Sequence, residues 1–192
     1  MDLVPCQAPD RDGYGAAVTD HDPEPEAAPG AGPGGDADPG AVDERAVVAE
    51  LLGRAPQGAF EVVARDADGR PAVIRNAPLL DDGTPMPTRY WLVDRSLTRR
   101  IGTLESAGGV RTAESEVDPD ELRAAHDRYA AERDAALPDD WAGPRPSGGV
   151  GGTRTGVKCL HAHYAWHLAG GDDPVGRWVA ARLDGERDDA GA

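Results

Sequence analysis

The segment at residues 60–76 reads FEVVARDADGRPAVIRN, and its pattern decides the fold class. Apolar side chains recur at every second position from Phe60 onward, which is the period of a β-strand. The stretch DADG at 66–69 has the composition of a turn, and a second extended piece follows it at 71–76. The sequence therefore predicts a β-hairpin.

A third strand is expected at residues 88–93, TRYWLV, which are aromatic and apolar enough for the middle of a sheet. Helical spacing and capping residues predict five helices: after Asp43, from Leu97 to Gly108, after Asp118, from about Gly156 to Ala169, and after Asp173. Strands come early and helices late, without βαβ alternation. The sequence therefore predicts an α+β fold, with a small antiparallel sheet of about three strands packed against four to five helices.

The chain has 192 residues, enough for one ordinary domain. Residues 1–44 contain eleven acidic side chains against one arginine, together with seven prolines and seven glycines. Such a composition buries too little apolar surface to offset the entropy of ordering the chain. We expect a disordered acidic Pro/Gly-rich tail at 1–42, a single α+β domain at 43–185 and a frayed C-terminus at 186–192.

Composition also limits the partners and the compartment. The formal net charge of −15 argues against nucleic acid, because nucleic-acid binders rely on Lys and Arg facing phosphates. No apolar run approaches the ~18 residues that cross a bilayer, and no secretion signal is evident, so no membrane partner is expected. Cys6 and Cys159 give no disulfide framework, which favours a reducing, cytoplasmic location.

The stretch GGVGGTRTGVKCLHAH at 148–163 is the best candidate for a binding site. A glycine-rich loop that leads into a helix presents backbone N–H groups and the positive end of the helix dipole, which suit a phosphate or carboxylate. Gly151 and Gly152 would shape the loop, while Arg154 and Lys158, the only lysine in the chain, would contact the anion. The stretch lacks the ending of a nucleotide-binding P-loop. We therefore expect a module that binds a phosphorylated or carboxylate small molecule.

An enzyme is an alternative interpretation of the same stretch. His161 or His163 would then act as general acid–base, and Arg154 and Lys158 would stabilise charge on the substrate. An enzyme needs a titrating group in a cleft beside these cations, whereas a binding module needs only the cations and the backbone donors.

A metal site is a third interpretation. Cys159, His163 and His167 follow one another at intervals of four residues, a spacing at which thiolate and imidazole groups on one helical face can bind zinc. Asp66, Asp94 and His126 are the candidates for a further ligand, which would make a degenerate Cys/His/Asp site. No CxxC or HExxH motif supports it. The sequence accordingly predicts no bound metal and no cofactor.

Several motifs together resemble the bacterial domain of unknown function 501 family. They are DGTPMPT at 82–88, YWL at 90–92, HDRY at 126–129, VKCLHAH at 157–163 and DPVG at 173–176. The resemblance covers about residues 45–184 and implies a cytosolic bacterial protein, but it implies no activity. Many relatives carry cysteines near Asp66 and Asp94, where this chain has none. The resemblance thus implies either that a thiolate site was lost here or that Asp66 and Asp94 supply oxygen ligands instead.

Overall fold

The computed structural model describes residues 43–190, so the predicted tail at 1–42 lies outside the described residues. The elements in chain order are α1 (Glu44–Leu52), β1 (Phe60–Arg65), β2 (Pro71–Asn76), β3 (Tyr90–Leu92), α2 (Arg95–Ser106), α3 (Gly109–Glu116), α4 (Pro119–Asp134), the 3₁₀ turn η1 (Val150–Gly152), α5 (Leu160–Leu168) and α6 (Pro174–Ala190). α6 thus continues into the segment for which the sequence predicts a frayed end.

The three strands form one antiparallel sheet in the order β1-β2-β3. The predicted turn between β1 and β2 is present: the carboxylate of Asp66 accepts the N–H groups of Asp68 at 2.9 Å and Arg70 at 2.8 Å. Gly69 supplies the positive φ of +81° that closes the turn. The predicted hairpin and the predicted antiparallel sheet are both confirmed.

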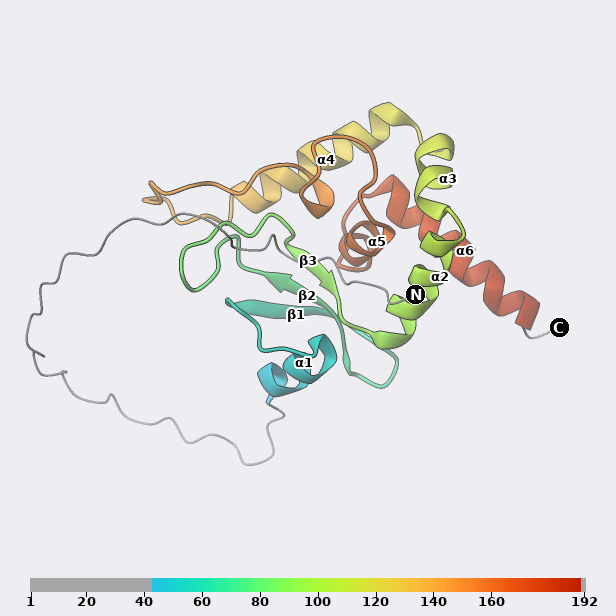
Figure 1. Ribbon diagram of the computed structural model, residues 1–192, viewed down its shortest axis with the longest axis horizontal. Helices are drawn as coiled ribbons and strands as arrows, with labels where there is room; N and C mark the ends of the chain where they lie inside the picture. Colours follow the sequence, from blue (N-terminus) through green and yellow to red (C-terminus); the bar gives the residue numbers. More distant parts are fainter. Residues whose placement is uncertain (1–42, 191–192) are drawn as a thin grey trace, which may run out of the picture. The chain divides into compact units, whose positions relative to one another are not determined.

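Both faces of the central strand β2 are covered by helices (Figure 1). Successive side chains in a strand point to opposite faces, so Val73 and Ile74 belong to different parts of the core. Ile74 packs in a cluster with Val48 of α1, whereas Val73 packs in a cluster with Tyr129 of α4 and Trp166 of α5. The short helix α5 is thereby buried between the sheet and the outer helices.

The predicted α+β class is confirmed, and the described chain contains six α-helices rather than four to five. The additional helix is α3, which begins at Gly109, where the sequence predicted only a helix end. Gly108 turns the chain with a φ of +88°, and a Cβ on Gly109 would lie 2.6 Å from the carbonyl oxygen of Leu104. The two glycines therefore form a tight corner between two helices. Among the described residues, no helix combines the length and apolar character needed to cross a bilayer.

Candidate functional site

His126 of α4 holds the glycine loop, residues 148–158, against the core. Its Nδ1 accepts the N–H of Val150 at 3.0 Å, and its Nε2 lies 3.0 Å from the carbonyl oxygen of Gly156. Because Nδ1 is the acceptor, these contacts assign the ring proton to Nε2, which donates to Gly156. One neutral imidazole thus fixes the loop at two points six residues apart.

A buried arginine fixes the beginning of the same loop. Arg133 of α4 is 2% exposed, and its Nη1 donates to the carbonyl oxygen of Gly148 at 2.5 Å. Its charge is balanced by Asp134, whose carboxylate lies 2.8 Å from Nη2. A backbone carbonyl thus receives a charge-assisted hydrogen bond in a buried position, where such bonds are strong. The loop is therefore a structured part of the domain.

Gly151 and Gly152 bend the loop, as their sequence position suggested. Their φ angles are +66° and +77°, a region that favours glycine. A Cβ on Gly152 would lie 3.3 Å from Pro87, a close contact, whereas a Cβ on Gly151 would meet Ala162 at 3.4 Å and Lys158 at 3.8 Å, which are ordinary contacts. The positive φ, more than the space, therefore favours glycine at these positions.

Arg154 and Lys158 both lie exposed on this loop. Within the described chain neither side chain makes an ion pair or a hydrogen bond, and the backbone N–H groups of Arg154, Gly156 and Lys158 have no protein acceptor. Two exposed cationic side chains and three backbone donors of one short loop are thus left without a partner in the described part of the chain.

The start of α5 differs from the expectation, because internal carboxylates occupy its amide donors. The helix begins at Leu160, not near Gly156, and the N–H of Leu160 donates to Glu105 of α2 at 2.6 Å. The N–H of Val157 donates to Glu114 of α3, also at 2.6 Å. An anion at the helix end would have to displace Glu105, so the positive end of the helix dipole is already compensated from within.

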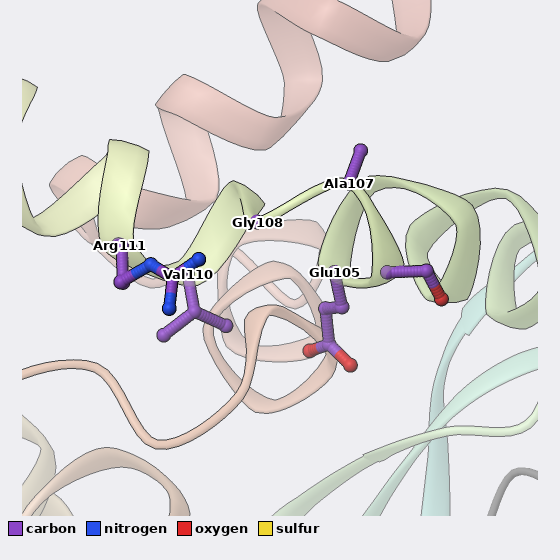
Figure 2. A pocket seen from close by; sticks show the side chains of 6 residues that line it. Glu105, Ala107, Gly108, Val110 and Arg111 are labelled. Atoms are coloured by element: carbon purple, nitrogen blue, oxygen red, sulfur yellow. The ribbon is translucent and has the colours of Figure 1, made fainter.

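Glu105 lines a hollow of about 360 Å³ at the corner between α2 and α3. Figure 2 shows Glu105 and Val110 extending to the same side of this corner, while Ala107 extends to the other. Burial alone would raise the pKa of Glu105, but hydrogen bonds and charge from His161, with the N–H of Leu160, outweigh it and lower the pKa. Glu105 is therefore a carboxylate whose hydrogen bonds go to Leu160 and His161 of the protein itself.

The family described as Protein of unknown function (DUF501) matches residues 62–181, which is more than half of the chain. The chain belongs to this family. The match confirms the resemblance seen in the sequence, and it includes most of the sheet and the whole loop at 148–158. Searches of curated proteins and of solved structures found no match.

Both histidines of the acid–base alternative have structural partners in this DUF501 protein. His161 places Nδ1 3.2 Å from Glu105 and Nε2 3.0 Å from the carbonyl oxygen of Thr98. His163 is fully buried, with Nδ1 2.7 Å from the carboxylate of Asp173. A catalytic role for His161 would require one of its two contacts to break, and His163 has no exposed surface to meet a substrate. The acid–base role stays a prediction.

The four metal candidates lie at separate places in the DUF501 fold. Asp66 closes the hairpin turn, Asp94 caps α2 by accepting the N–H of Leu97 at 2.8 Å, Cys159 precedes α5, and His163 pairs with Asp173. Among the described residues, no three His, Cys, Asp or Glu side chains come close enough together to hold a metal ion. The structure thus gives each candidate a local structural position and assembles no ligand set from them.

Three polar contacts that stabilise this region were not predicted from the sequence. They join Glu105 to the start of α5, Arg133 to Gly148, and Asp173 to His163. Glu105 and Arg133 act on residues 55 and 15 positions away, so no local spacing reveals them. Asp173 was visible as a helix start before a proline, but its pairing with His163 depends on how α5 and α6 pack.

We expect acid to destabilise this DUF501 protein partly through His126. Burial, and next the charge of His163, lower the pKa of His126 below its usual 6.5. The unfolded chain then binds more protons than the folded one below about pH 6.5, so the free energy of unfolding falls as the pH drops, by at most ~1.4 kcal/mol per pH unit. Urea unfolding at pH 7.5 and pH 5.5 measures this loss, and the His126→Gln variant should lose less. An equal loss in both proteins would contradict the assignment.

Proposed function

We propose that the protein is a binding module in which the glycine loop, residues 148–158, takes up the phosphate or carboxylate group of a small molecule. The observation that carries the proposal is a loop of fixed shape whose outward donors have no protein partner. His126 and Arg133 hold the loop from the inside, while the side chains of Arg154 and Lys158 are exposed and the N–H groups of Arg154, Gly156 and Lys158 have no acceptor among the described residues.

Two internal carboxylates limit the part of the loop where a ligand can bind. Glu105 and Glu114 already accept the N–H groups of Leu160 and Val157, so the ligand would bind to the loop and not to the helix end. The three N–H groups without an acceptor belong to alternate residues, 154, 156 and 158, and would donate to an anion bound beside the two cationic side chains. Arg154 and Lys158 would add charge-assisted hydrogen bonds, which are stronger than those of neutral donors.

Titration of the full chain with inorganic phosphate, followed by calorimetry, tests the proposal. Each charge-assisted bond is worth about 1.5–3 kcal/mol, so Arg154→Ala and Lys158→Ala should each weaken phosphate binding about tenfold. Higher salt should weaken it further, because exposed charges are screened at Debye lengths of ~8–10 Å.

Arg123→Ala is the matched control, because Arg123 is also an exposed cation but lies on α4 and pairs with Asp120. It should bind phosphate like the unaltered chain. If both loop variants also retain the original affinity, the proposed function is wrong, and the loop serves only to connect α4 to α5.

A further inference from the structure

Arg89 is a buried cation with hydrogen-bond donors left over. It directly precedes β3 and is 9% exposed. Its Nε and Nη1 atoms are buried and make no hydrogen bond to any residue of the described chain. Nε lies 3.4 Å from the carboxylate of Glu132, close enough for charge attraction but without the geometry of a hydrogen bond.

Glu132 attracts the Arg89 guanidinium group, but its hydrogen bonds go to other residues. One of its oxygens accepts the hydroxyl of Tyr90, and the other accepts Nε1 of Trp166 at 3.1 Å. Buried polar atoms in native proteins nearly always have a hydrogen-bond partner, and the exceptions call for an explanation. The guanidinium group of Arg89 therefore retains hydrogen-bonding capacity that the described chain does not use.

Arg89 also lines a hollow of about 320 Å³ where β1 begins and β2 ends. Arg75 is a second cationic residue of its lining, and Pro78 and Ala136 bring apolar surface. Sites for small molecules commonly combine a volume of ~300–1,000 Å³ with a few convergent polar groups in an apolar lining. The hollow is thus large enough for a small ligand that has one charged and one apolar part.

We propose that this hollow binds a small organic acid, with its carboxylate between the guanidinium groups of Arg89 and Arg75 and its apolar part against Pro78 and Ala136. A guanidinium group offers paired N–H donors in a plane, which match the two oxygens of a carboxylate. The carboxylate of Glu61 already pairs with Arg75 beside this hollow, so the position next to Arg75 accepts such a group. The site is separate from the loop at 148–158 and does not depend on the proposed function.

Benzoate is a suitable probe, with benzamide as its uncharged counterpart of the same shape. In NMR titrations of the full chain, benzoate should shift the amide signals of residues 59–61, 75–78 and 89, whereas benzamide should leave them unchanged. Arg89→Met should weaken benzoate binding at least tenfold, and Arg75→Met should weaken it to a smaller extent, because Arg75 is more exposed. Arg70→Met is the control, since Arg70 is an exposed cation at the hairpin turn, outside the hollow.

Glu61→Gln tests the same site without touching a buried residue, because the Glu61 side chain is 67% exposed. It removes the carboxylate that competes for Arg75, so benzoate should bind about threefold more tightly, a gain that a folding defect would not produce. Equal binding of benzoate and benzamide, unchanged affinity in Arg89→Met, or no gain in Glu61→Gln would overturn the proposal. Arg154→Ala should keep benzoate binding intact, which separates this site from the loop.

Discussion

Replacing Asp173 with alanine should lower the free energy of unfolding by about 3–5 kcal/mol, the range for removing one partner of a buried pair that contains a carboxylate. Asp173 is 0% exposed, and one carboxylate oxygen lies 2.7 Å from Nδ1 of His163. The other oxygen accepts the N–H of Gly176 at 2.9 Å and so caps the start of α6. The substitution therefore leaves a buried imidazole without its acceptor and a helix without its cap.

Urea unfolding at neutral pH measures this loss, and the adjacent Asp172 provides a matched control. Asp172 is exposed and pairs with Arg128 and Arg177 on the surface, where such pairs contribute at most about 1 kcal/mol. Asp173→Asn should fall between the two, because asparagine can still cap α6 but carries no charge toward His163. A loss in Asp173→Ala no larger than that in Asp172→Ala would show that the buried pair does not hold α5 to α6.

The elements with strictly local causes could be predicted from the sequence. The hairpin at 60–76 follows from period-two spacing around a turn whose Asp66 accepts nearby backbone N–H groups. The starts of α1 and α4 follow from Asp43 and Asp118, whose carboxylates accept N–H groups two and three residues later. In each case, every partner lies within four residues, so the pattern is visible without tertiary structure.

The start of α5 could not be predicted, because it depends on distant residues. The glycines at 148–156 suggested a helix beginning near Gly156, but that residue has a φ of +66°. Glu105, which is 55 residues away, accepts the first helical N–H at Leu160. The sequence also predicted that a helix ends at Gly109. Instead, glycine is required there because the backbone of Gly109 closely approaches the carbonyl oxygen of Leu104.

The candidate site, too, has features that could be predicted from the sequence and features that could not. The exposure of Arg154 and Lys158 was predictable, because they stand among glycines and polar residues in a loop. His126 and Arg133 were not identified as the residues that hold this loop. Their hydrogen-bond partners are backbone groups of a segment that has no helix or strand periodicity of its own. Sequence patterns thus identified the exposed groups of the loop but not the internal contacts that give it a fixed shape.

Gly149→Ala should lower the free energy of unfolding by about 1–3 kcal/mol, as is typical when an atom is added to a closely packed position. The new Cβ would lie 2.4 Å from Nδ1 of His126 and 2.5 Å from its Cβ. Relief of this clash would require the loop or the His126 ring to move, which would break the hydrogen bond from the N–H of Val150. Urea unfolding measures the loss, and phosphate titration shows whether the displaced loop also binds less tightly.

A double-mutant cycle identifies His126 as the cause. In a His126→Ala background the ring is absent, so Gly149→Ala should cost much less, and the two losses should not add. Gly185→Ala is the control, because a Cβ there meets no atom within 4 Å and alanine favours the helix by up to about 1 kcal/mol. If Gly149→Ala is equally costly with and without His126, the ring is not what positions the loop. The shape that presents Arg154 and Lys158 would then have to come from Arg133 and the glycine φ angles alone.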